Sequence, residues 1–301
     1  MQSRADHLPG WVVAAVTQLL GVAPRDWEPR SGGHTQAGKA RATLPDGCHV
    51  FVKWAQGGAT AALRDELRVL GVVRGSFMPL AVAWSEDPAV LILEDLSDAR
   101  WPPPFPDDST PLWEALEAKA GIEPPADLPR LEDWPGSRHR WRRVAEDPRL
   151  FLGLGVATEA WLTAAVDDLA TAEESVTLAG SQLVHNDVFS ANIAFSGDRA
   201  VLVDWATAAV GNALLDTAMA VLSLRVDGGP VARLDFPNEA GFAALLAGHN
   251  ALEAPAPVPA WARPDSTMRA EQLGDLRHAL AWAAELLDLP APDGPAALGA
   301  V

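Results

Sequence analysis

One segment, "LVHNDVFSANIAFSGDRAVLVDW" at residues 183–205, limits the possible folds more than any other part of the chain. Most of its residues are apolar and suit buried strands, but His185, Asn186 and Asp187 interrupt them in a row. The turn signal "SGDR" separates two apolar runs, which predicts an antiparallel hairpin centred on Asp198. The polar interruption fits either an ordinary surface turn or a functional site.

The predicted hairpin brings three oxygen-bearing side chains together. Asn192 lies six residues before Asp198 and Asp204 lies six after it, so they should sit side by side at the open end. Asp187 belongs to the loop that enters this end. Each residue alone fits an ordinary turn or strand end. Together, an amide and a carboxylate suit Mg²⁺, and a second carboxylate can accept a proton from a hydroxyl.

A magnesium ion held by two protein groups normally brings substrate phosphates with it, so phosphate-binding parts are expected elsewhere. The loop "SGGHTQAG", residues 31–38, offers backbone N–H groups, but it lacks the P-loop pattern and also fits a plain loop. Lys53 interrupts the apolar strand "VFVKWA", where an unpaired ammonium is costly. Glu66, on a helix predicted over 59–73, would pair with it. An edge-strand lysine and a solvated glutamate are the alternatives.

The order of predicted elements indicates two unlike lobes. Residues 1–96 read as a β-rich lobe with strands in 41–54 and 88–96, and proline-rich 99–111 follows as a connector. Residues 97–301 read as a larger helical lobe, and sites for small ligands favour the space between such lobes. Apolar periodicity predicts helices over 11–22, 112–120, 139–147, 156–178, 214–225, 239–248 and 268–287.

Composition narrows the partners and the location. Apolar residues make up 49% of the 301, which is typical of a globular protein. A net charge of −17 argues against nucleic acid and favours a cationic partner, unless it only serves solubility. No apolar run is long enough to span a membrane. A single cysteine, Cys48, and the lack of a targeting segment favour the cytoplasm.

The sequence of motifs resembles the protein-kinase-like fold: glycine loop, strand lysine, helix glutamate, acid-ended strand, H-x-D-x-x-x-x-N, strand and aspartate. Within it, "LVHNDVFSANIAF" and "LVDWATAAVGNALLDTA" at 202–218 are similar to the aminoglycoside phosphotransferase and choline kinase family. The resemblance extends over roughly 30–220. It implies an α+β fold with a small β-rich N-lobe and a larger helical C-lobe.

The resemblance also implies roles for the polar residues. Asp187 would orient and activate the hydroxyl of the acceptor substrate. Asn192 and Asp204 would hold Mg²⁺ on the phosphates of ATP. Lys53, positioned by Glu66, would contact the α- and β-phosphates.

Main-chain groups would complete the ATP site. In the resemblance, the glycine loop covers the phosphates through Ser31, Gly32 and Gly33. The connector "LEDL" offers main-chain groups of Glu94 and Leu96 to adenine.

Two further residues would support the catalytic loop without touching substrate. They are His185 and Asp216. The family most often has glycine where this chain has Asn186, a mild change because asparagine tolerates left-handed backbone angles. Every catalytic group is retained, so an inactive homologue is not expected.

These observations predict an ATP-dependent phosphotransferase that acts on a hydroxyl of a small cationic molecule. Acidic residues are abundant in 94–135 and 206–301, which suits an aminoglycoside or a basic peptide antibiotic, and hence a resistance enzyme. Choline-like, amino-sugar or other small metabolites are the alternative acceptors. A nucleotide-binding regulator without turnover is an alternative of another class. A protein kinase is disfavoured because no long activation segment or APE motif follows Asp204.

Overall fold

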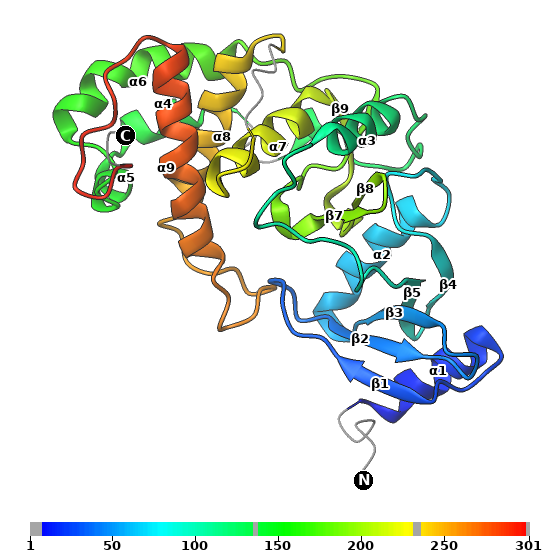
Figure 1. The fold of residues 1–301 in the computed structure, drawn as a ribbon. Helices are drawn as coiled ribbons and strands as arrows, with labels where there is room; N and C mark the ends of the chain where they lie inside the picture. Colours follow the sequence, from blue (N-terminus) through cyan, green and yellow to red (C-terminus); the bar gives the residue numbers. More distant parts are fainter. Residues whose placement is uncertain (1–7, 135–137, 231–235, 299–301) are drawn as a thin grey trace.

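The computed structural model describes residues 8–134, 138–230 and 236–298. A five-stranded antiparallel sheet in the order β1-β2-β3-β5-β4 forms the first layer (Figure 1). Its strands are β1 (Asp26–Pro29), β2 (Gly38–Thr43), β3 (His49–Trp54), β4 (Ala81–Glu86) and β5 (Ala89–Glu94). The strands predicted in 41–54 and 88–96 are confirmed. Strands β1 and β4 were not predicted, because β1 has only four residues and β4 is exposed or half-buried along its whole length.

Helices cover the two faces of this sheet. Helix α1 (Gly10–Leu20) packs Val12 and Val16 against Ala40 and Val52, on one face. Helix α2 (Thr60–Leu70) lies on the other face, where its leucines meet Leu91 and Leu93 of β5. Strand β5 is therefore buried on both sides, which explains why its sequence is a continuous apolar run.

Two small antiparallel pairs lie around the predicted catalytic residues, in what we call the catalytic region. Strand β6 (Gln182–Val184) pairs with β9 (Ala209–Gly211), and β7 (Ile193–Ser196) pairs with β8 (Arg199–Leu202). In Figure 1 the β7–β8 hairpin lies between α2 and the helical body. The described helices of that body are α3 (Thr110–Ala120), α4 (Arg140–Glu146), α5 (Arg149–Gly153), α6 (Glu159–Glu174), α7 (Leu214–Val226), α8 (Glu239–Glu253) and α9 (Met268–Leu286).

The predicted hairpin is confirmed, but the predicted centre of its turn is wrong. The strands are joined by a two-residue turn of Gly197 and Asp198, not by a turn centred on Asp198. Gly197 has a φ of 63°, which glycine adopts readily at the first central position of a hairpin turn. Asn192 consequently lies opposite Val203, whose N–H donates to the Asn192 carbonyl at 3.0 Å. Asp204 follows one residue beyond this pair.

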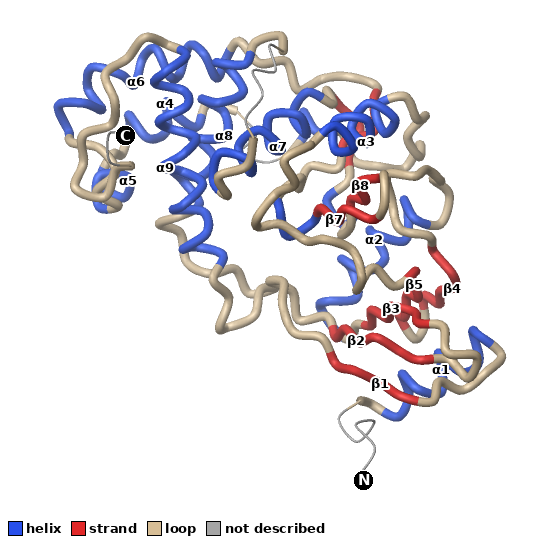
Figure 2. Tube along the Cα trace, in the orientation of Figure 1, coloured by secondary structure: helices blue, strands red, loops and turns tan. Residues whose placement is uncertain are grey.

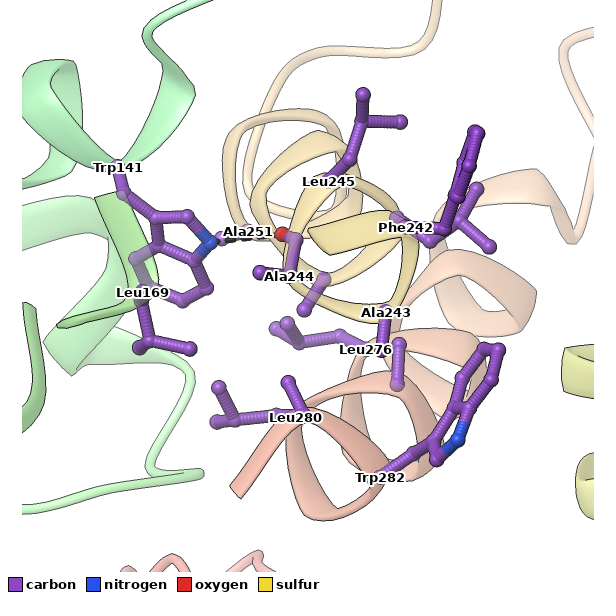
Figure 3. Packing of buried hydrophobic residues seen from close by; sticks show 14 of the residues in the cluster. Trp141, Leu169, Phe242, Ala243, Ala244, Leu245, Ala251, Leu276, Leu280 and Trp282 are labelled. Carbon is purple, nitrogen blue, oxygen red and sulfur yellow. Dashed lines mark hydrogen bonds between the residues drawn. The ribbon is translucent and has the colours of Figure 1, made fainter. Parts of the chain in front are cut away.

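The helical body is segregated from the sheet, as the tube in Figure 2 shows. Helices α8 and α9 pack side by side through alanines and leucines, and Trp141 of α4 points at α8 (Figure 3). The indole Nε1 of Trp141 donates to the Ala244 carbonyl at 2.8 Å. This packing positions α9, which carries Asp275 within electrostatic reach of Asp187. Among the described helices, none combines the length and apolar character needed to cross a bilayer.

Candidate active site

The buried carboxylate of Asp216 holds the backbone of the loop that follows β6. Asp216, at the start of α7, accepts hydrogen bonds from the backbone N–H groups of His185 (2.7 Å) and Asn186 (2.8 Å). Asn186 has a φ of 62°, the left-handed conformation that the sequence anticipates there. Lys119 of α3 lies 2.6 Å from the Asp216 carboxylate and donates to the Leu183 carbonyl at 2.7 Å. Both charged side chains are completely buried.

His185 is a fully buried part of this scaffold. Its Nε2 lies 3.1 Å from the Val203 carbonyl, and its ring packs edge-on against Trp205 with centroids 4.5 Å apart. Burial lowers the pKa of His185 to about 4, so the ring is neutral at physiological pH. The Nε2–H therefore donates to Val203, which ties the loop to the residue before Asp204.

Asp187 and Asn192 are in direct contact. The Asn192 amide Nδ2 donates to the Asp187 carboxylate at 2.8 Å and to the Asp187 carbonyl at 3.0 Å. Burial, followed by the charge of the nearby Asp204 carboxylate, raises the pKa of Asp187 to about 7. A carboxylate with such a pKa is suited to proton transfer near neutral pH.

Asp204 stands at the end of the second strand in an unusual backbone conformation. Its φ of 67° is left-handed, which for a residue other than glycine is found mostly where the surrounding structure enforces it. Its carboxylate lies 3.6 Å from the Lys53 ammonium. The positive charge of Lys53 lowers the pKa of Asp204, which keeps this carboxylate ionised.

Lys53 and Glu66 form the ion pair that the sequence predicts. The ammonium of Lys53 donates to both carboxylate oxygens of Glu66, at 2.8 and 2.9 Å. Burial opposes the charge on Lys53, but the carboxylates of Asp204 and Glu66 outweigh it and raise its pKa. Helix α2 thus positions a charged lysine beside Asp204.

The glycine loop meets the helical body directly. Ser31, Gly32 and Gly33 are exposed, with φ values of 119° for Gly32 and 72° for Gly33. The next two residues dock against the segment before α9, where Thr35 forms a β-bridge with Ala262. In Figure 1 the loop between β1 and β2 accordingly lies against the loop that leads into α9.

The side chain of His34 holds the glycine loop to this segment through two contacts. Its Nδ1 lies 2.9 Å from the Ser266 hydroxyl, and its Nε2 lies 3.0 Å from the Glu271 carboxylate. The Arg263 N–H also donates to the His34 carbonyl at 2.8 Å. Nothing in the sequence signals this contact, because its partners are more than 220 positions apart.

Removing the His34 side chain should make the glycine loop more mobile. In His34→Ala, the amides of 31–37 and 262–266 should exchange hydrogen about tenfold faster, because two side-chain contacts are lost. Hydrogen exchange followed by mass spectrometry measures this. His49→Ala is the control, since the side-chain hydrogen bond that His49 makes among the described residues is with Thr43, at the far end of β2 (3.1 Å). Unchanged exchange in His34→Ala would mean that the backbone bridge alone holds the loop.

The connector after β5 is also tied to its surroundings. The Glu94 carboxylate accepts from the Leu80 N–H at 2.9 Å and pairs with Arg199 at 2.8 Å. The Leu96 carbonyl accepts from the Ala99 N–H at 3.0 Å and from the Trp101 indole at 3.1 Å. The side chain of Glu94 and the carbonyl of Leu96 are therefore structural, and other main-chain groups would have to serve a ligand.

Three carboxylates near the start of α9 and the end of α7 form a group that we call the acidic cluster: Asp227, Glu271 and Asp275. Burial, followed by the charges of Glu271, Asp227 and Asp187, raises the pKa of Asp275 to about 7. Asp275 therefore lies within electrostatic reach of Asp187. The sequence showed an acidic stretch here but not that Asp275 would lie within electrostatic reach of Asp187.

The site residues can also be tested for their fit to Mg²⁺. The Nδ2 of Asn192 is engaged by Asp187, which leaves its carbonyl oxygen for a cation. Asp204 remains 33% exposed and ionised. In the described ranges, no group of three or more His, Cys, Asp or Glu side chains is arranged to hold a metal alone. The donor set therefore suits a hard cation that takes its remaining ligands from phosphates and water.

Comparison with known proteins decides the family. A model of the "Phosphotransferase enzyme family" matches residues 26–254. The chain belongs to this phosphotransferase family. The matched span of the phosphotransferase includes the glycine loop, Lys53, Glu66 and the whole catalytic region, but it ends before α9. A search of the curated proteins gave no match.

Solved structures show that the phosphotransferase shares a kinase-like fold. A fructosamine-3-kinase candidate from Thermobifida fusca YX-ER1 is 21% identical, with a TM-score of 0.53 over 91% of this chain and 99% of that one. Aminoglycoside phosphotransferase APH(4)-Ia, a thermostable mutant with ADP and hygromycin B, is 15% identical with a TM-score of 0.53 over 94% and 99%. A choline/ethanolamine kinase family protein from Mesorhizobium loti is 15% identical with a TM-score of 0.55 over 87% and 91%.

Proposed function

We propose that this phosphotransferase transfers the γ-phosphate of ATP, in the presence of Mg²⁺, to a hydroxyl of a small cationic molecule. One observation carries the proposal: Asn192 contacts Asp187, Lys53 contacts both Glu66 and Asp204, and the charge of Asp204 reaches Asp187, so these groups lie at one site. Phosphoryl transfer depends mainly on positioning the reactants and neutralising their charge. These groups can bind a metal-bound triphosphate and accept the proton of a hydroxyl, and the reaction needs little else.

Each residue then has a defined task. Asp187 accepts a hydrogen bond from the acceptor hydroxyl and takes its proton as the oxygen bonds to the γ-phosphorus and ADP departs. Lys53 neutralises the α- and β-phosphates while Glu66 fixes its direction. Ser31, Gly32 and Gly33 supply backbone N–H groups over the phosphates. Main-chain groups of the connector at Glu94 and Leu96, other than the Leu96 carbonyl, face adenine.

The remaining site residues hold the others in place. Asn192 and Asp204 would hold Mg²⁺, which when bound neutralises phosphate charge. Asn192 also orients the Asp187 carboxylate through its amide. His185 and Asp216 keep the catalytic loop in shape without touching substrate.

The acidic cluster supports a cationic acceptor. Burial and the charges of Glu271, Asp227 and Asp187 disfavour the charged form of Asp275, and a cationic ligand would relieve this repulsion. Aminoglycosides and basic peptide antibiotics have this character, in which case the protein would confer resistance. Choline-like molecules, amino sugars and other small metabolites have it too and form the alternative.

Asp275→Asn should test this assignment. Losing one charge contact should raise the KM for a cationic acceptor about tenfold and leave the KM for ATP within about twofold. Steady-state kinetics with each substrate varied measures both. Glu285→Gln is the matched control, because Glu285 lies on the same helix with its side chain 63% exposed. An unchanged acceptor KM in Asp275→Asn would remove the cationic-acceptor assignment and leave phosphoryl transfer intact.

A screen of ATP consumption tests the function itself. The protein with Mg²⁺ and ATP should be assayed against aminoglycosides, basic peptides, choline, amino sugars and neutral sugars. Consumption with one small alcohol, and a phosphorylated product of the expected mass, supports the proposal. ATP binding without consumption by any acceptor would instead favour a nucleotide-binding regulator. Phosphorylation of protein substrates would favour a protein kinase.

The proposal also assigns a separate role to each lobe. We place the nucleotide-binding lobe at 1–96 and the lobe with the catalytic loop and the acceptor side at 97–301. A cytoplasmic location agrees with a supply of ATP and with a single free cysteine, Cys48.

A further inference from the structure

The chain contains only three lysines, and all three lie in or beneath the site. They are Lys39, Lys53 and Lys119, while every other permanent side-chain cation is arginine. Lys53 is paired with Glu66 and Asp204, and Lys119 with Asp216. Lys39 is the exception. Among the described residues it makes no ion pair and no side-chain hydrogen bond, so its role is unexplained by the protein alone.

The sheet register places Lys39 beside Lys53. The two residues are direct cross-strand partners on β2 and β3. Their neighbours Ala40 and Val52 point to the opposite face and pack with α1. Because side chains alternate along a strand, both ammonium groups lie on the face that looks toward Asp204 and α2.

The glycine loop lies directly over the Lys39 ammonium. A Cβ added at Gly33 would come 2.8 Å from the Lys39 Nζ, and the φ of 72° at Gly33 also disfavours a side chain. The ammonium therefore occupies the space beneath the loop that, in the proposed function, covers the phosphates.

This arrangement is electrostatically unfavourable in the free protein. Like charges directly opposite one another on a sheet are destabilising. The nearby carboxylates of Glu66 and Asp204 are already engaged with Lys53. Burial, and then the charge of Lys53, accordingly lower the pKa of Lys39. An anion between the two lysines would convert this repulsion into attraction.

We propose that Lys39 is a second phosphate-binding lysine, which contacts the triphosphate of a nucleoside triphosphate from beneath the glycine loop, alongside Lys53. The inference rests on the proposed function, because it takes the nucleotide to lie under Ser31–Gly33. No motif in the sequence predicts that Lys39 binds the triphosphate.

Replacing Lys39 should weaken nucleotide binding without harming the fold. Lys39→Met should raise the Kd for ATP about 10- to 100-fold, the loss expected for a hydrogen bond between charged groups. Adenosine, which has no phosphate, should bind as in the wild type. The free variant should melt at the same temperature or higher, because the repulsion with Lys53 is gone. Calorimetric titration and thermal melts measure these quantities, and Lys39→Arg should recover part of the affinity.

Arg25→Met is the matched control, since it removes one positive charge from an exposed position just before β1, away from the pair of lysines. Wild-type ATP affinity in Lys39→Met would overturn the inference. An equal loss of ATP and adenosine binding would also overturn it, because the effect would not be directed at the phosphates. If the wild type itself binds no ATP, the proposed function fails first, so the two failures are distinguishable.

Amine labelling gives a second readout that needs no substitution. With only three lysines, each labelled peptide is unambiguous by mass spectrometry. Lys39 should react with an acetylating reagent in the free protein, while Lys53 and Lys119 are shielded in buried ion pairs. ATP should protect Lys39 and adenosine should not. Labelling of Lys39 that ATP leaves unchanged would count against the contact.

Discussion

Asp187→Asn should lower kcat by about 10²- to 10⁴-fold while the affinity for ATP stays within about twofold of the wild type. Asparagine has the size of aspartate and can still accept the hydrogen bond from the Asn192 amide, which is 2.8 Å long in the wild type. It cannot take a proton from the acceptor hydroxyl. The loss should therefore appear in turnover and not in nucleotide binding, as measured by product formation and by calorimetry.

Asp198→Asn is the control for this substitution. Asp198 is an exposed residue in the turn of the same hairpin, so the change removes one negative charge nearby without touching the site. Near-normal turnover in Asp187→Asn would falsify the assignment of the catalytic base, and with it the interpretation of the H-x-D-x-x-x-x-N motif.

Lys119→Met should lower the free energy of unfolding by about 3–5 kcal/mol. The substitution leaves the Asp216 carboxylate buried without its cation, although Asp216 must still accept the N–H groups of His185 and Asn186. It also removes the donor to the Leu183 carbonyl. Urea denaturation followed by fluorescence measures the loss, and any folded fraction should turn over slowly because the catalytic loop is loosened.

Two further variants make this result specific. Arg130→Met breaks an exposed pair with Glu132 and should cost less than about 1 kcal/mol. Adding Asp216→Asn to Lys119→Met removes the stranded charge, so the double variant should lose less stability than the sum of the two single losses. A Lys119→Met variant as stable as Arg130→Met would show that the buried pair contributes little.

The parts of the site that lie close in sequence could be predicted. Asn192 and Asp204 flank the strands of one hairpin and Asp187 lies in the loop that enters it, so a turn signal between two apolar runs predicts that they lie close together. The pairing of Lys53 with Glu66 could be predicted because a buried ammonium needs a partner and a helix follows at once. The exact register could not, since "SGDR" allows more than one turn position.

The parts that depend on distant contacts could not be predicted. Lys119 stands 97 positions before Asp216, and its place in the last turn of α3 looks like that of any solvated lysine. The position of Lys39 beside Lys53 became evident only from the register of β2 and β3. The docking of the glycine loop and the position of Asp275 depend on where α9 packs, and the family match ends before that helix.

The position of α9 has a consequence for how the two substrates influence each other. The Glu271 carboxylate contacts His34 of the glycine loop. Asp275 belongs to the acidic cluster and lies four residues later on the same face of this helix. In the proposed function, an acceptor that engages the cluster would change the electric field at His34, which holds the glycine loop. Thermodynamic linkage then requires the nucleotide to alter acceptor affinity by the same factor, so neither binding constant is defined without stating the occupancy of the other site.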